Sequence, residues 1–218
     1  MENIVSPKID MSFDEWVKFV FDHSVSDDSQ SAWYWDEQLS IFWEKWTLSE
    51  GRIAERQLEF ATTLFQNSAA LLARYSPEQI NQGFWFLLNG HSSFSLADFI
   101  WNIELDWNLR EQCIKSMVKP FRVIFTQIPE QDSCNMWWDM LRNFGDSIDL
   151  KVVEAMLQTM AEILQFPSLA CQVSALHGLG HIKHDGKRKV IEDYLQVNSN
   201  LDKEIQDYAL AAIEGKIL

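Results

Sequence analysis

Three histidines lie close together near the C-terminal end of this 218-residue sequence. His177, His181 and His184 are four and three residues apart in the stretch SALHGLGHIKHDGK, residues 174–187. On an α-helix this spacing places the three imidazoles along one face. Imidazole nitrogens are frequent ligands of transition metals, so the pattern raises the hypothesis of a metal site.

The same spacing limits how many of the three histidines can share one ion. From His177 to His184 a helix rises roughly 10.5 Å at about 1.5 Å per residue, whereas a metal binds an imidazole nitrogen at about 2.1 Å. Cys171 projects from another side of the helix, and no nearby carboxylate completes a ligand set. We therefore predict no metal cofactor, and the pair His177–His181 remains the alternative.

Other catalytic patterns are absent from the sequence. It contains no GxSxG, no glycine-rich phosphate loop and no HExxH. Gly178 and Gly180 lie inside a helical pattern, so they predict close helix packing rather than a dinucleotide turn. The three cysteines (Cys113, Cys134 and Cys171) are scattered and form neither a disulfide framework nor a zinc-binding pair. We therefore expect a protein that is not an enzyme.

An acidic stretch leads into an aromatic cluster near the N-terminus. Trp35 lies on the apolar face of a helix predicted to reach Trp46, whereas Trp33 and Tyr34 lie off that face. Exposed aromatic rings bordered by acids are typical of interfaces. An equally weighted alternative packs the rings under the N-terminal helix as a cap. The candidate partner-binding residues of this stretch are Asp27, Asp28, Trp33, Tyr34, Asp36 and Glu37.

A second aromatic stretch reads CNMWWD, residues 134–139. Adjacent residues on a helix point about 100° apart, so Trp137 and Trp138 are both buried only if two neighbours enclose them. The favoured interpretation places both rings in the core. The alternative keeps Trp138 with Asp139 as an anchor for an Arg or Lys side chain of a partner.

The charge of the chain is unevenly distributed. The formal net charge is −14, and residues 1–50 hold eleven acidic and three basic residues, which gives −8. Such a field repels nucleic acid and attracts a basic protein partner; the alternative is that it serves solubility alone. The first residues show no secretory signal, and no apolar run reaches the roughly 20 residues that span a bilayer. We expect a cytoplasmic protein without membrane contact.

Helical signals recur along the chain, and no alternating pattern predicts a strand. Ser12–Glu15 and Thr47–Glu50 read as capping boxes, and Ser76 followed by Pro77 reads as a helix start. Pro120 must kink or divide the helix that begins near Trp107. Predicted helices begin near residues 13, 35, 50, 77, 95, 107, 134, 150, 167, 187 and 201.

The histidine stretch resembles the first helix of a HEAT repeat. The pattern R-x-x-A-x-x-A-L-G-x-I is matched by Gln172, Ala175, Gly178, Leu179, Gly180 and Ile182, with glutamine in place of arginine. The chain also resembles an uncharacterised bacterial group that combines C-x-M-W-W-D with C-Q-x-S-A-L-H-G-L-G-H. The resemblance implies an all-α fold, either a HEAT-like α-solenoid or an irregular stack of antiparallel helices.

We expect one domain over residues 1–218. Residues 1–47 would form acidic, aromatic N-terminal capping helices, residues 48–148 degenerate helical hairpins, and residues 149–218 HEAT-like repeats. The favoured function is a protein-binding module, of the immunity or antitoxin type, that binds a basic toxin. The alternatives are an α-solenoid adaptor for a peptide or helix, and a metal-dependent enzyme that uses the histidines.

Overall fold

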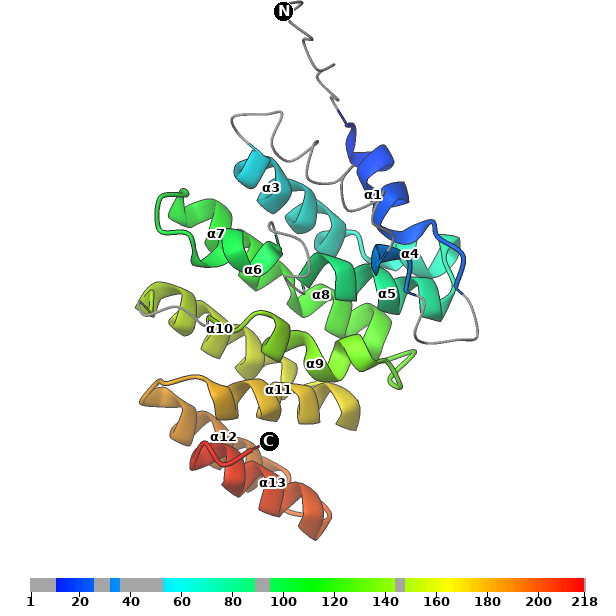
Figure 1. Cartoon of the computed structure of the whole chain (residues 1–218). Coiled ribbons are helices and arrows are strands. Elements are labelled where there is room, and N and C mark those ends of the chain that lie inside the picture. The colour runs from blue at the N-terminus through cyan, green and yellow to red at the C-terminus, as the bar shows by residue number, and fades with distance from the viewer. Residues whose placement is uncertain (1–10, 26–31, 36–52, 89–94, 144–147, 218) are drawn as a thin grey trace, which may run out of the picture.

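The protein is all-helical in the part of the chain that the structure describes. A computed structural model describes residues 11–25, 32–35, 53–88, 95–143 and 148–217 (Figure 1). No β-strand occurs in these ranges. The prediction of an all-α fold is therefore confirmed.

The elements follow one another with short connections. In chain order they are α1 (Phe13–Phe21), the short 3₁₀ turn η1 (Trp33–Trp35), α3 (Ile53–Gln66), α4 (Ala69–Arg74), α5 (Pro77–Leu88), α6 (Leu96–Trp101), α7 (Trp107–Ser116), α8 (Val118–Pro120), the π-helical segment η2 (Phe121–Phe125), α9 (Asp132–Met140), α10 (Leu150–Ile163), α11 (Leu169–His181), α12 (Gly186–Val197) and α13 (Lys203–Ile213).

Local capping chemistry explains where several helices begin. Ser12 caps α1 in a reciprocal box with Glu15, as predicted. Ser95 caps α6 in the same manner with Asp98. Asp149 accepts a hydrogen bond from the Lys151 amide and so caps α10. The predicted box Thr47–Glu50 lies outside the described residues.

Two long predicted helices are divided in the structure. The helix predicted to begin near residue 50 breaks into α3 and α4 around Asn67 and Ser68. The segment that begins at Trp107 breaks into α7 and α8, and Pro120 stands at the junction with η2. A proline there lacks an amide hydrogen, so the regular hydrogen-bond ladder cannot continue through it.

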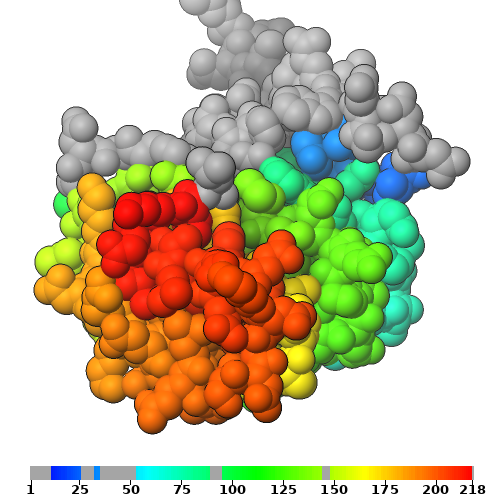
Figure 2. Space-filling view, turned by 90° about the horizontal axis from the view of Figure 1, so that it is seen from below, coloured from blue at the N-terminus to red at the C-terminus, as the bar shows by residue number. Residues whose placement is uncertain are grey.

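The helices form successive layers from the N-terminal to the C-terminal end (Figure 1). α1 packs on α5, and α3 packs on α6 and α7. α10 joins α7 to α11, and α11 lies between α9 and α13. Seen from the C-terminal end, α12 and α13 cover the last layer in orange and red (Figure 2). α11 therefore has neighbours on several sides, as its broad apolar surface requires.

Large aromatic rings fill the centre of the molecule. Trp137 is fully buried, and its ring contacts Phe84 and Phe121 at centroid distances of 5.2 and 5.4 Å. Trp138 is 4% exposed and stacks on Phe121. The interpretation of both tryptophans as core residues is confirmed. Trp138 is therefore no exposed anchor for a partner, because Phe121 of η2 and Gly178 of α11 pack against it.

Two glycines of α11 permit close helix packing, as predicted. A Cβ atom added to Gly178 would lie 2.5 Å from Met160 Sδ and 2.5 Å from Trp138 Cγ. A Cβ atom added to Gly180 would lie 2.2 Å from Ile217 Cδ1. Neither position has room for a side chain, so α11 can approach α9, α10 and the C-terminal segment closely.

Among the described residues, no helix combines the length and apolar character needed to cross a membrane.

Candidate functional site

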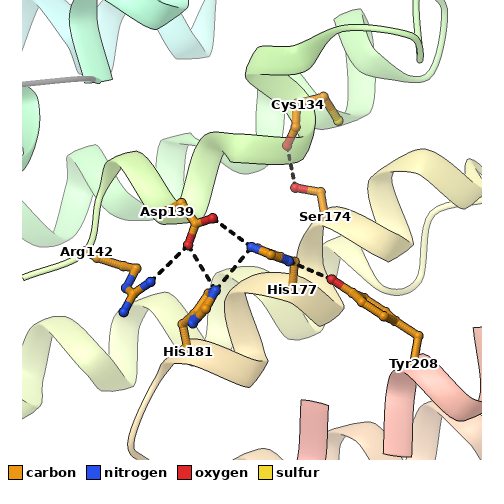
Figure 3. Close-up of polar contacts among 7 residues, drawn as sticks. All are labelled: Cys134, Asp139, Arg142, Ser174, His177, His181 and Tyr208. Atoms are coloured by element: carbon orange, nitrogen blue, oxygen red, sulfur yellow. Dashed lines mark hydrogen bonds and ion pairs between the residues drawn. The ribbon is translucent and has the colours of Figure 1, made fainter. Parts of the chain in front are cut away.

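The two stretches CNMWWD and SALHGLGH meet where α9 packs on α11. Ser168 caps the start of α11, and its helical register turns Ser174, Gly178 and the first two histidines towards α9. The Ser174 hydroxyl donates a hydrogen bond of 2.5 Å to the Cys134 carbonyl oxygen (Figure 3). One turn further along α11, Gly178 lies against Trp138. This contact fixes the register between the helices and brings Asp139 opposite the histidines.

Asp139, His177 and His181 form a compact cluster (Figure 3). His177 Nε2 lies 2.7 Å from Asp139 Oδ2 and 3.1 Å from His181 Nε2. His181 Nε2 lies 3.0 Å from Asp139 Oδ1. Three groups that can each ligate a metal thus turn towards one another, two from α11 and one from α9.

Tyr208 of α13 holds the far side of the His177 ring. Its hydroxyl oxygen lies 2.6 Å from His177 Nδ1, and the two rings are nearly parallel. Because Nδ1 is engaged by Tyr208, only Nε2 of His177 faces Asp139 and His181. Burial raises the pKa of Tyr208, and the charge of Asp139 raises it further.

One oxygen of Asp139 lacks a hydrogen bond. Oδ1 is buried and lies within ion-pairing distance of His181 Nε2 at 3.0 Å and of the Arg142 guanidinium at 3.5 Å. However, it accepts no hydrogen bond with proper direction in the described part of the chain. The His181 and Arg142 nitrogens are thus close to Oδ1, but their N–H groups are not aligned with it for a hydrogen bond. Buried acceptors without a donor are rare in proteins, and a bound ion can satisfy such an oxygen.

The cluster is partly shielded from solvent. The side chains of His177, His181 and Asp139 are 12%, 16% and 18% exposed. Burial lowers the pKa of His181, and the charges of Arg142, His177 and Lys187 act in the same direction, whereas Asp139 opposes them. His181 is therefore neutral at pH 7, which is the form of imidazole that binds metals.

His184 belongs to a separate interaction, as its axial offset predicts. Its Nε2 lies 2.8 Å from Glu154 Oε2, and its Nδ1 accepts a hydrogen bond of 2.9 Å from the Gly186 amide. Both ring nitrogens are thus engaged at the start of α12. This histidine is a natural control for any experiment on the other two.

The sequence predicted that no carboxylate lies near His177 and His181, and this prediction is wrong. Asp139 precedes His177 by 38 residues, and the helix contact brings it into the cluster. The sequence did single out Asp139, although as part of a partner-binding anchor.

The predicted N-terminal surface is only partly described by the structure. Trp33 is buried at 9% exposure; its ring stacks on His23 at 3.8 Å and contacts Phe86 at 4.5 Å. Tyr34 is half-buried beside it. Trp33 as an exposed anchor is therefore wrong, because it packs against α1 and α5, as the capping alternative requires. Asp27, Asp28, Asp36 and Glu37 lie outside the described residues.

The cysteines are all buried and unpaired. Burial raises the pKa of Cys113 to about 12, so its thiol is protonated at neutral pH. The Cys171 thiol donates to the Phe121 carbonyl oxygen at 3.6 Å. These residues fill space in the core as small apolar groups.

No family model, no curated protein and no solved structure matches this chain.

Proposed function

We propose that the protein binds one divalent transition-metal ion through Asp139, His177 and His181. The observation that carries the proposal is the convergence of three ligand atoms, from two helices, on one point. Two imidazoles and one carboxylate are a ligand set used by zinc and by non-haem iron(II).

The distances between the ligand atoms fit a single ion that the Asp139 carboxylate binds through both of its oxygens. Two ligands that bind one ion at about 2.1 Å, with angles of about 90–110°, lie roughly 3.0–3.4 Å apart. The Nε2 atoms of His177 and His181 are 3.1 Å apart, and His181 Nε2 is 3.0 Å from Asp139 Oδ1. The shortest separation, 2.7 Å between His177 Nε2 and Asp139 Oδ2, is a hydrogen-bond distance. It needs to lengthen by only a few tenths of an ångström.

A purely structural cluster accounts for the geometry less completely. In that alternative, His177 Nε2–H donates to Asp139 Oδ2, and the cluster only ties α9 to α11. The arrangement leaves the buried Oδ1 without a hydrogen bond and brings two imidazole nitrogens together, of which only one can donate to the other. A cation between the three groups would satisfy Oδ1 and both nitrogen lone pairs together.

The neighbouring residues suit a metal centre. The Tyr208 hydroxyl at His177 Nδ1 occupies the outer position that commonly orients a metal-binding imidazole. Three protein ligands leave at least one coordination position for water or another ligand. The proposal is thus a centre with an open position.

Cobalt(II) titration tests this proposal. A tag-free chain, dialysed against chelator, should bind one equivalent of cobalt and develop visible d–d absorption typical of a low-coordinate site. Asp139→Asn, His177→Ala and His181→Ala should each abolish the absorption, while His184→Ala keeps it. Unchanged absorption in the three variants, or none in the folded parent chain, would refute the site.

A second candidate function is capture of a basic protein by a HEAT-like helical array, in the manner of an immunity protein. The charge of −8 over residues 1–50 supports it. Neutralising Asp27, Asp28, Asp36 and Glu37 to amides should slow association with a basic partner and weaken its dependence on salt. Association that is insensitive to both changes would remove the electrostatic basis of this function.

A further inference from the structure

A pocket of about 270 Å³ adjoins the metal-site cluster. It lies between α6, α9, α10 and α11, and His181 forms part of its wall. The pocket is also lined by Trp138 and Arg142, which come before and after Asp139 in the sequence. A molecule in this pocket would therefore contact one ligand of the proposed ion. The volume is near the lower end for small-molecule sites, which favours a compact ligand.

The charge of the pocket is opposite to that of the chain. The protein carries −14 overall. Yet the described residues that line the pocket include Arg142 and Lys183 and no aspartate or glutamate. The Arg142 guanidinium already lies 3.5 Å from Asp139 Oδ1, so it stands between the cluster and the pocket. Asp139 offsets part of the charge of Arg142, but Lys183 adds a second cation, and the described part of the wall has no acid, so an anionic ligand is favoured.

The rest of the wall is largely apolar. Met156 of α10 and Ile182 beside the cluster supply thioether and aliphatic surface. Methionine side chains adapt to varied ligand shapes.

We propose that this pocket binds a small organic carboxylate, with its apolar body against Met156 and Ile182. The carboxylate accepts hydrogen bonds from Arg142 and Lys183. The position of the molecule beside a metal centre rests on the proposed function, but its binding to the pocket does not. The two proposals can therefore fail separately.

Benzoate and the neutral, similarly shaped benzyl alcohol are suitable probes. Binding is followed by calorimetry and by tryptophan fluorescence, in chelator-treated chain and in zinc-loaded chain whose zinc content is measured. Benzoate should bind both forms, at least about tenfold more tightly than the alcohol, since a charge-assisted hydrogen bond contributes about 1.5 kcal/mol or more. Equal binding of the two probes, or no benzoate binding, would overturn the proposal.

Variants locate the binding. Arg142→Gln combined with Lys183→Gln should weaken benzoate about tenfold or more and leave benzyl alcohol unchanged. Lys189→Gln, which removes an exposed cation of α12 outside the pocket, is the matched control and should have no effect. Equal loss in the control would show nonspecific attraction and reject the pocket. Benzoate binding that needs Arg142 and Lys183 in a chain without zinc affinity would uphold the pocket and reject the metal centre.

Discussion

At the scale of single residues, the environment of His177 defines the site. One nitrogen of its ring faces Tyr208, and the other faces Asp139 and His181. This division fixes the orientation of the ring and leaves one nitrogen for a metal. A histidine that only filled space on a helix would not need partners on both sides.

Tyr208→Phe tests the orienting role of the hydroxyl. Loss of an outer partner of a metal-binding histidine usually weakens metal affinity by about 10- to 100-fold. We expect a weakening of that order in cobalt titration, with helix content unchanged. Tyr194→Phe is the control: Tyr194 donates to buried Gln172, which is not part of the cluster, so this variant should keep full affinity. Equal affinities in the two variants would remove Tyr208 from the site.

At the scale of elements, the ends and contacts of helices decide where the cluster forms. Capping boxes at Ser12 and Ser95 are visible in the sequence because their partners are three residues away. The register of α9 on α11 is not visible, because it depends on Gly178 beneath Trp138 and on Ser174 at the Cys134 carbonyl. Helix positions were therefore predictable from sequence, and the carboxylate of the cluster was not.

Gly178→Ala should disturb the contact between α9 and α11. The added methyl group would lie 2.5 Å from both Met160 Sδ and Trp138 Cγ, so the helices must move apart. We expect a loss of about 1–3 kcal/mol in unfolding free energy, as for other overpacked cores, and weaker cobalt binding. Gly186→Ala, where the nearest atom lies 3.0 Å away, should cost less and keep the site. Normal cobalt binding by Gly178→Ala would contradict the role given to this contact.

A buried ion pair joins α7 to the start of α10. Arg110, 4% exposed, lies 2.8 Å from Asp149. Asp149→Asn keeps a capping side chain but leaves the guanidinium without its counter-charge. We expect a loss of about 2–4 kcal/mol in urea unfolding at pH 7. Arg122→Gln breaks an exposed ion pair with Glu162 and should change stability by less than about 1 kcal/mol.

The effect of Asp149→Asn should depend on pH. Burial raises the pKa of Asp149, but the hydrogen bonds and charges of Arg110 and Lys151 outweigh it and hold the pKa below the ordinary value of 3.8. Ionisation therefore stabilises the fold above that value, and this contribution is lost as the pH falls through the lowered pKa. The difference between parent and variant should be constant from pH 5 to 7 and shrink below about pH 4. A difference that grows on acidification would contradict this sign.

At the scale of the whole molecule, helices stacked in chain order place motifs from different layers side by side. The sequence predicted the helical class and the burial of the CNMWWD tryptophans, because helical periodicity and large apolar area are local properties. It left the place of Trp33 undecided, since that depends on the distant Phe86. The net charge of −14 is read from the sequence, but only the packed chain brings Arg142 and Lys183 to one pocket.

Elemental analysis of tag-free protein, purified without added metal, shows whether the chain holds a metal ion at this cluster. We expect close to one transition-metal ion per chain in the parent and in His184→Ala. We expect almost none in His177→Ala and Asp139→Asn, with helix content retained in both. A folded parent chain that neither carries a transition metal nor takes one up on addition would rule out the metal centre.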